Sequence, residues 1–451
     1  MSGPDHLYQR DALLRRLVRR DAGNAIHKLL AASRPQDIAA AMEHLTWAEQ
    51  RRLYRLIPEQ DYAAEVLSHL SDVSSREVTR EMTEEQIVDL IDRMEPDDAT
   101  DIVGVLPVDV QQRVLFELRD EETSEVVGDL LEYPSDTAGG IMSPRAFEMR
   151  VTATCGQAIA ALQEDHAEVE SVQYVYVLDR ARHLVGVTSL RTLLTNKPST
   201  PLAQIMTREI IAVGPEEDQE EVARFVARYD LLAIPVVDAD RKLLGIVTVD
   251  DVVDVIHQEL AEDMMLMAGV QGTSDDYSVF RQGAQRAGWL LATIVGGICA
   301  AELIGVYEDT LKQVAVLAGF IPVIMGMGGN VGIQSATLAV RGLATGSVQG
   351  GGVLKFVFSE ARIGVMIGVF YALLLGIYGV VRYPEPMIGV ALACSIFLAI
   401  AAASVLGSTV PLALNRAGVD PAIATGPFVT TLVDLLGILI YFTVARALLG
   451  L

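Results

Sequence analysis

Residues 322–344 read PVIMGMGGNVGIQSATLAVRGLA, an apolar segment long enough to cross a membrane. Helix-breaking and polar residues interrupt it: Pro322, Gly326, Gly328, Gly329, Asn330, Gly332 and Gln334. Such residues free backbone carbonyls and allow close approach, and irregular backbone at membrane depth is tolerated only where it is buried in protein or lines a watery cavity. The segment therefore predicts an irregular span beside a pathway through a membrane.

Helix packing is the alternative explanation, because Gly328 and Gly332 have the spacing of a small-xxx-small helix contact. Packing accounts for the glycines but not for Asn330 and Gln334, two amides four residues apart on one helical face. Polar side chains inside a membrane usually face a pathway or a partner. The amides therefore favour the pathway.

The carboxyl-terminal part contains five apolar segments, at residues 288–307, 313–340, 363–381, 387–414 and 422–449. With the amino terminus inside, the inner flanks carry six basic residues and the outer flanks three, as the positive-inside rule requires. The inner residues are Arg281, Arg286, Arg341, Lys355, Arg362 and Arg416, and the outer ones are Lys312, Arg382 and Arg446. An odd number of spans places the carboxyl terminus outside. Five spans are few for a transporter built from two halves, so a pore on a dimer axis is the simpler geometry.

Asp434 lies well inside the fifth apolar segment, ATGPFVTTLVDLLGILIYFTVARALL. A carboxylate at this depth is costly, so a pore-facing or partner-facing position is expected. A buried ion pair is the alternative, but no Lys or Arg falls near the centre of any span. Glu302, near the end of the first span, can reach the outer interface instead.

The excess negative charge lies in the first 282 residues, which hold 27 Lys and Arg against 52 Asp and Glu. Such a surface attracts cations and repels nucleic acid, so no nucleic-acid partner is expected. The first twenty residues, MSGPDHLYQRDALLRRLVRR, lack the apolar core of a signal peptide. This part is therefore expected to stay in the cytoplasm. Three cysteines form neither a disulfide framework nor a zinc motif.

Residues 25–130 predict short helices in a loose repeat of about 24 residues, typical of a small solenoid. Asp97 and Asp101 are four residues apart in it, and like charges at this spacing destabilise a helix unless a cation lies between them. A solvated surface is the alternative explanation. From residue 139 the pattern changes to two copies of a strand pair that leads into a helix.

Both copies resemble a CBS (cystathionine β-synthase) domain, which commonly binds adenine nucleotides. In the second copy, GIVTVDD places Thr248 and Asp251 where that family has its ribose-binding threonine and aspartate. The first copy reads GVTSLRT, with Thr192 at the aspartate position. The following helix, residues 250–270, carries carboxylates along one side and predicts either a cation-bridged linker or a wet helix face.

The segments GGNVGIQSATLAVRGLATG (328–346) and GPFVTTLVDLLGILIYF (426–442) resemble the signature segments of the MgtE family of magnesium channels. The resemblance implies a homodimeric multidomain membrane protein that contacts membrane lipid. Its parts would be an α-solenoid N-terminal domain (1–136), an α+β tandem CBS pair (137–200 and 201–257), an acidic connecting helix (258–282) and an all-α domain of five transmembrane helices (283–451).

The family's pore residues correspond to Asp434, which selects the ion, and to Gly328, Gly329 and Asn330 in the second span. Its cytosolic Mg²⁺ ligands correspond to Glu65, Asp97, Asp101, Asp218, Glu220, Asp230, Asp251, Asp254, Glu259, Glu262 and Asp263, with Asp420 at the inner mouth. ATP or another adenine nucleotide is the expected ligand of the CBS pair, through Thr248 and Asp251.

The expected function is Mg²⁺ import through a channel of the bacterial-type inner membrane, shut when cytosolic Mg²⁺ bridges the acidic domains. An ion-coupled secondary transporter of Mg²⁺, Mn²⁺ or Co²⁺ is the alternative, since it would use the same Asp434. A membrane-anchored nucleotide sensor or enzyme is disfavoured, because the sequence contains no nucleophile motif, phosphate loop or metal-catalytic constellation.

Overall fold

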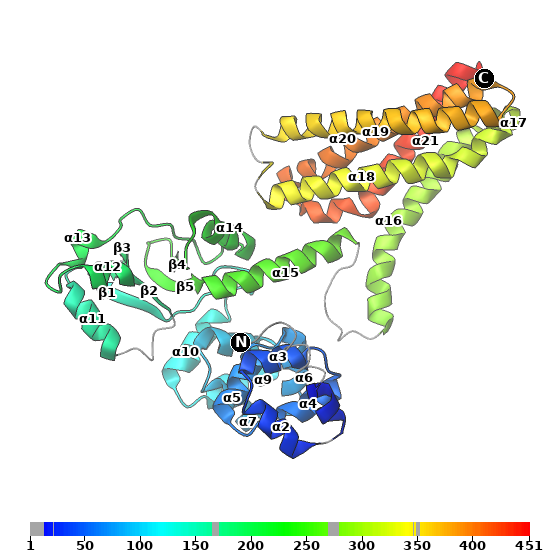
Figure 1. The fold of residues 1–451 in the computed structure, drawn as a ribbon. Coiled ribbons are helices and arrows are strands. Elements are labelled where there is room, and N and C mark those ends of the chain that lie inside the picture. Colours follow the sequence, from blue (N-terminus) through cyan, green and yellow to red (C-terminus); the bar gives the residue numbers. More distant parts are fainter. Residues whose placement is uncertain (1–12, 21, 165–170, 269–278, 346, 349–351) are drawn as a thin grey trace. The chain divides into compact units, whose positions relative to one another are not determined.

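The computed structural model describes the chain except for residues 1–12, 21, 165–170, 269–278, 346 and 349–351 (Figure 1). The chain divides into two compact units, residues 1–258 and 259–451. Because residues 269–278 are not described, part of the predicted connecting segment 258–282 lies outside the described residues.

The first unit begins with a domain of short helices, as the repeat predicts (Figure 1). They are α2 (Gly23–Leu30), α3 (Pro35–Met42), α4 (Trp47–Tyr54), α5 (Gln60–Ser68), α6 (Asp72–Thr79), α7 (Glu84–Ile91), α8 (Pro96–Gly104), α9 (Val108–Glu117) and α10 (Glu121–Leu130). Side-chain caps fix where some of them start; at α7, for example, Thr83 and Gln86 form a capping box. Each helix buries one apolar face in a shared core that includes Leu53, Ile91 and Val103.

The two predicted α/β copies follow, and each contains the expected strand pair. Strands β1 (Ala146–Arg150), β2 (Ser171–Leu178) and β3 (Leu184–Ser189) form one sheet, while β4 (Ala233–Val237) and β5 (Leu243–Thr248) form another. The pairs β2/β3 and β4/β5 are antiparallel, and β1 joins β2 in parallel. The accompanying helices are α11 (Cys155–Glu164), α12 (Leu190–Thr195), α13 (Leu202–Ile205) and α14 (Gln219–Tyr229). The internal duplication is confirmed.

Helix α15 (Val249–Met267) starts directly after β5 and runs without a break for 19 residues. It carries the predicted acidic series, from Asp250 and Asp251 in its first turn to Asp263 near its end. The boundary between the two compact units falls within it, after Gln258.

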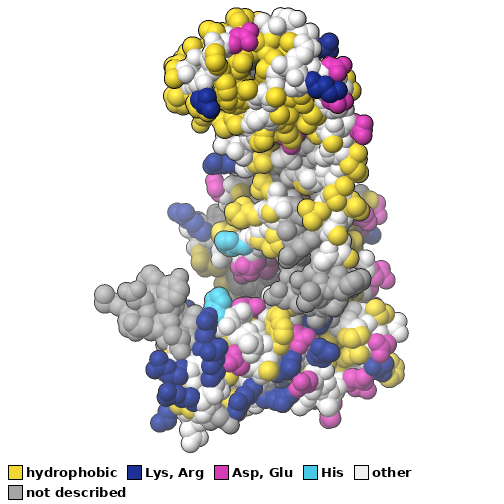
Figure 2. All heavy atoms as spheres, turned by 90° about the vertical axis from the view of Figure 1, so that its right-hand side faces the viewer, with side chains coloured by type: hydrophobic (Ala, Val, Ile, Leu, Met, Phe, Trp, Pro, Cys, Tyr) yellow, Lys and Arg dark blue, Asp and Glu magenta, His cyan; other side chains and the backbone are white. Residues whose placement is uncertain are grey.

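The second unit is a helical bundle with mostly apolar exposed faces (Figure 2). Its elements are α16 (Val279–Val306), α17 (Glu308–Gln313), η1 (Ala315–Phe320), α18 (Ile321–Ala344), α19 (Gly352–Arg382), α20 (Pro386–Arg416), η2 (Pro421–Thr425) and α21 (Pro427–Leu449). Four stretches are long and apolar enough to span a membrane: Ala315–Ala344, Gly352–Arg382, Pro386–Arg416 and Pro427–Leu449. The apolar part of α16, Leu290–Val306, is shorter.

The prediction of irregular backbone at residues 322–344 is wrong, because α18 is continuous from Ile321 to Ala344. Pro322 lies in the first turn, where its missing N–H costs nothing. The glycines serve close packing instead. A Cβ built at Gly407 of α20 would lie 2.3 Å from the carbonyl oxygen of Gly332, and one at Gly332 would lie 2.9 Å from Cγ2 of Val433 on α21. Glycine thus lets α20 and α21 approach the α18 backbone.

Candidate functional site

Asp434 lies on α21 at the contact with α18. The preceding residue, Val433, is buried against the glycine face of α18, and a Cβ at Gly328 would lie 3.2 Å from it. The next position along α21 is rotated by about 100°. This rotation puts the Asp434 carboxylate beside Gly329, where an added Cβ would lie 3.8 Å from Oδ1. The two glycines thus have different neighbours: Gly328 adjoins Val433, and Gly329 adjoins the carboxylate.

Asp434 forms no ion pair or hydrogen bond with any residue that the structure describes. The nearby hydroxyl of Thr430 turns back to its own helix and donates to the carbonyl oxygens of Gly426 and Pro427, at 3.2 and 3.1 Å. The carboxylate is only partly exposed. A carboxylate in this position attracts a cation from outside the chain.

Asn330 and Gln334 lie together on an exposed face of α18, as their spacing predicts. Both line a cavity of about 550 Å³ whose other wall includes Met366 and Phe370 of α19. The two amides thus line a cavity of the bundle, but this cavity lies toward α19 and not toward α21, which carries Asp434. Of the four predicted pore residues, Gly329 and Asp434 are neighbours, Gly328 packs on α21, and Asn330 opens toward α19.

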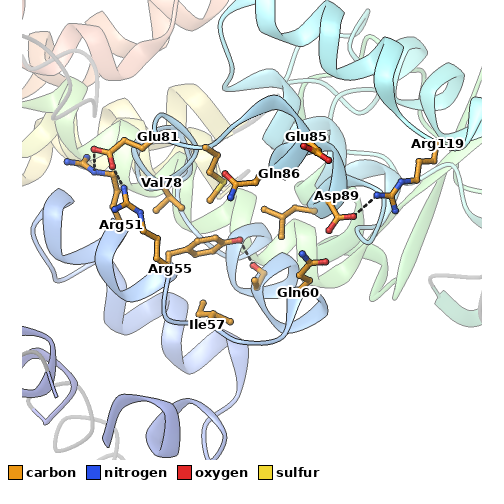
Figure 3. A pocket seen from close by; sticks show the side chains of 14 residues that line it. Arg51, Arg55, Ile57, Gln60, Val78, Glu81, Glu85, Gln86, Asp89 and Arg119 are labelled. Atoms are coloured by element: carbon orange, nitrogen blue, oxygen red, sulfur yellow. Dashed lines mark hydrogen bonds and ion pairs between the residues drawn. The ribbon is translucent and has the colours of Figure 1, made fainter. Parts of the chain in front are cut away.

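Several acidic residues of the helical domain are paired with arginine. Arg51 lies 3.1 Å from Glu81 and Arg119 lies 2.8 Å from Asp89. These residues line a hollow with a volume of about 560 Å³, and their side chains are labelled in Figure 3. On the same domain Glu84 pairs with Arg113 at 2.8 Å. Such pairs neutralise their own charge, so these carboxylates are poorly suited to a cation sensor.

The acids of α8 differ. Asp97, Asp98 and Asp101 form no ion pair within 4 Å in the described part of the chain, and the buried Oδ1 atom of Asp97 has no hydrogen-bond partner there. Asp251, in the first turn of α15, is close enough to raise the pKa of Asp98 and of Asp101 through its charge. The structure thus brings together three predicted ligands from two domains of the first unit.

Burial and like charge raise the pKa values of this group, which we call the α8–α15 acidic cluster (Asp97, Asp98, Asp101 and Asp251). Burial, followed by the charges of Asp97 and Asp101, raises the pKa of Asp98 to about 7. Burial raises the pKa of Asp101 to about 7 as well, and the charges of Asp72, Asp97 and Asp251 add to this rise.

The remaining pKa values of the cluster shift in the same direction. Burial raises the pKa of Asp251 to about 6, against the hydrogen bonds that Thr248 donates. The pKa of Asp97 is also raised, mainly by burial. A bound divalent cation would relieve the repulsion within the cluster.

The other predicted cytosolic ligands have local structural roles or partners of their own. Glu65 accepts a hydrogen bond from Gln36 at 3.1 Å, and Asp218 caps α14 by accepting from the backbone N–H of Glu220 at 2.8 Å. Asp230 ends the same helix in the left-handed conformation, with φ of 52°. Asp420 caps η2 through the backbone N–H of Ala422 at 2.8 Å.

The last four predicted ligands, Asp254, Glu259, Glu262 and Asp263, follow Asp251 along α15. In the described residues no three His, Cys, Asp or Glu side chains already converge into a group that could hold a metal ion.

The predicted nucleotide residues form a helix cap. Thr248 donates from its hydroxyl to Oδ2 of Asp251 at 2.5 Å. In the first copy the equivalent residues, Ser189 and Thr192, form the same arrangement, with hydroxyl oxygens 2.9 Å apart. The two copies thus share the local geometry, and only the second carries a carboxylate.

Sequence reasoning missed two acidic residues. Asp98 belongs to the α8–α15 acidic cluster, and the consecutive acids in PDDATD were a signal for it. Glu360 is buried in α19, where Ser335 of α18 donates to its Oε2 at 2.8 Å and Ser404 of α20 donates to its backbone oxygen at 2.7 Å. The sequence predicts that this apolar segment starts at residue 363 and so leaves Glu360 outside it, whereas α19 starts at Gly352.

Comparison with known proteins agrees with this architecture. The sequence profile "MgtE: Divalent cation transporter" matches residues 321–444, "MgtE intracellular N domain" matches 33–136, and "CBS domain" matches 202–258. The magnesium transporter MgtE of Thermus thermophilus is 35% identical, over 94% of this chain and 95% of that protein. The one of Bacillus subtilis is 32% identical, over 93% and 95%.

Among solved structures, the cytosolic domain of the Mg²⁺ channel MgtE in complex with ATP is similar. It is 34% identical with a TM-score of 0.50, and the match covers 54% of this chain and 99% of that one. Fold and matches together define an integral membrane transporter of divalent cations with a soluble amino-terminal part, and not an enzyme. The chain belongs to the MgtE family of magnesium transporters.

Proposed function

We propose that this chain forms a homodimeric Mg²⁺ channel in which Asp434 of each subunit selects the ion, and which cytosolic Mg²⁺ closes. The observation that carries the proposal is the Asp434 carboxylate, which lies beside Gly329 without a cationic partner among the described residues. Two such carboxylates across a dimer axis would form a site of charge −2. The amino-terminal domains would then be cytoplasmic and the carboxyl terminus outside, as the positive-inside distribution predicts.

Mg²⁺ dehydrates reluctantly and requires octahedral oxygen geometry. A pore that removed the waters of the ion would either bind the ion too tightly to release it or exclude it. We therefore expect the pore to select the hydrated ion. Carboxylates can accept hydrogen bonds from the coordinated waters, and Gly329 leaves space beside them. Selectivity then depends on the charge and size of the hydrated ion.

Gating is proposed to depend on the α8–α15 acidic cluster. Without Mg²⁺ its unpaired carboxylates repel one another, which favours separation of α8 from α15. With Mg²⁺ bound between them the compact arrangement is favoured, and the ion shifts the population toward the closed channel because it binds that form better. We propose further sites of this kind at the other acids of α15, Asp254, Glu259, Glu262 and Asp263, and at Glu65, Asp218, Glu220, Asp230 and Asp420.

Adenine nucleotide is a proposed ligand of the second CBS copy, through Thr248 and Asp251. The similarity to a cytosolic MgtE domain solved with ATP supports it. Because Asp251 also belongs to the acidic cluster, nucleotide and Mg²⁺ binding would be thermodynamically linked.

The channel proposal is tested by voltage-clamped bilayers that contain purified full-length protein. Two carboxylates about 5 Å from the ion, in the dielectric of water, favour a divalent over a monovalent ion by about 1.7 kcal/mol, or about 15-fold. Asp434→Asn should lose this preference, while Glu302→Gln, an exposed acid of the same bundle, should keep it. Unchanged selectivity in Asp434→Asn refutes the pore assignment, and flux without single-channel steps favours a coupled transporter.

A further inference from the structure

A row of hollows runs between α18 and α19. Both helices pack against α20, and the space between them remains open at three levels. The hollow at one end has a volume of about 720 Å³, the middle one about 550 Å³ and the far one about 200 Å³. Met327 and Tyr371 line both the middle and the far hollow, so these two adjoin. We call this row the α18–α19 groove.

The two ends of the groove differ in chemistry. The largest hollow lies at the end of the bundle opposite α17 and the carboxyl terminus, and it contains Arg341, Lys355 and Ser359 (Figure 1). Farther along, the walls are formed by Met366, Ile367 and Phe370, and the far hollow is almost wholly apolar. The groove therefore has a basic, hydroxyl-bearing head and an apolar tail.

The basic head is left with net positive charge. Arg341 and Lys355 are exposed and form no ion pair with any residue in the described ranges. The acid that shares their hollow is Glu360. Glu360 is 5% exposed, and its Oε2 accepts a hydrogen bond from the hydroxyl of Ser335, so its carboxylate points toward α18. With two cations and one carboxylate, the head is complementary to a single negative charge.

We propose that the α18–α19 groove binds a phospholipid with a headgroup of net charge −1. Its phosphate lies between Arg341 and Lys355, and one acyl chain lies along the groove past Met366 and Phe370. Basic pockets between membrane helices on the cytoplasmic side commonly bind anionic headgroups.

The length of the groove fits this occupant. Arg341 and Met327 are fourteen residues apart on one continuous helix, which is about 21 Å. One leaflet contributes about 15 Å of hydrocarbon. A chain anchored at Arg341 therefore ends about ten residues along α18, beside the cavity that Asn330 and Gln334 line. A soluble phosphate would use only the head and leave the apolar walls without an occupant.

The test is native mass spectrometry of the purified full-length protein, titrated with phosphatidylglycerol or phosphatidylcholine. Each basic residue near a membrane surface contributes about five-fold to anion affinity, so R341Q/K355Q should weaken phosphatidylglycerol binding about 30-fold. Arg362→Gln is the matched control, since Arg362 is exposed on α19 but does not line the groove. Glu360→Gln keeps the link to Ser335 and removes the opposing charge, so it should strengthen binding about five-fold.

Four results would overturn the proposal. Equal binding of the two lipids would mean ordinary boundary lipid, and an equal effect of Arg362→Gln would mean unspecific charge. Competition by millimolar glycerol 3-phosphate would mean a site for soluble phosphate. A phosphatidylglycerol with a photoreactive acyl end should label the segment Met366–Tyr371; absent labelling, together with disulfide-linked dimers of Met366→Cys, would assign the groove to a second copy of the chain.

Discussion

Protons and Mg²⁺ should compete for the α8–α15 acidic cluster. The pKa values of Asp98 and Asp101 are raised to about 7 and that of Asp251 to about 6. The perturbation is a change from pH 8 to pH 6. The folded pKa values exceed the unfolded value near 3.9, so the folded cluster binds protons more strongly. Without Mg²⁺, stability should therefore fall as the pH rises from about 4 to about 7.

The size of the competition follows from these values. At pH 6 a group of pKa about 7 is about nine-tenths protonated and one of pKa about 6 is half protonated, whereas at pH 8 nearly all three are charged. Metal ligands must be deprotonated. If one proton of pKa about 7 must leave, the apparent Mg²⁺ affinity is about 10-fold higher at pH 8 than at pH 6; if all three must leave, it is about 200-fold higher.

The assay is isothermal titration calorimetry of residues 1–258, which form a compact unit of their own. Titrations at pH 6 and pH 8, each in two buffers of different ionisation enthalpy, give both the affinity and the number of protons released. Asp98→Asn should lose part of the pH dependence. Glu84→Gln is the matched control, because Arg113 already neutralises that carboxylate.

The expected result is an affinity ratio between about 10 and about 200, with about one to two protons released per site at pH 6. A ratio below two, or proton release that is unchanged in Asp98→Asn, would contradict the proposed sensor. Mg²⁺ would then bind carboxylates other than those of the α8–α15 acidic cluster.

Three further predictions concern single residues. Gly329→Ala should fold normally, since its Cβ would lie 3.8 Å from the Asp434 carboxylate, but it should reduce Mg²⁺ conductance several-fold by filling the space beside the ion; unchanged conductance in bilayers would place the ion elsewhere. Gly407→Ala should destabilise the bundle by about 1–3 kcal/mol, because its Cβ would lie 2.3 Å from a backbone oxygen of α18. Thermal unfolding in detergent measures this, with Gly326→Ala, which has open space, as the control. Thr248→Ala should weaken ATP binding to the full chain in equilibrium dialysis, and equal binding would show that this hydroxyl does not contact the nucleotide.

The architecture could be predicted from the sequence because its signals are local. Alternating strands and helices at fixed spacing determine the duplicated α/β part, and short amphipathic segments determine the helical domain. Asp434 could be selected because a carboxylate in an apolar segment is conspicuous without any structure.

The errors arose where the answer depends on neighbours distant in the sequence. The glycines at residues 326–332 are compatible with a broken helix and also with a tightly packed one. The structure shows tight packing, because Val433 and Gly407 lie close to these glycines. Burial is the main cause of the raised pKa of Asp98, and Asp251, which is more than 150 residues away in the sequence, adds to it. The surroundings of Glu360 depend on Ser335 and Ser404, which lie 25 and 44 residues away in the sequence.

The unbroken course of α15 makes it a lever arm. Its 19 residues form a rod about 28 Å long, with Asp251 in the first turn and Met267 at the far end. Because the backbone hydrogen bonds resist bending, a tilt of the first turn is transmitted along the rod. A rotation of about 10° at Asp251 displaces the end at Met267, about 24 Å away along the helix, by about 4 Å. In the proposed gating, a small change in carboxylate spacing at the first turn would thereby be converted into a larger movement at the far end of the helix.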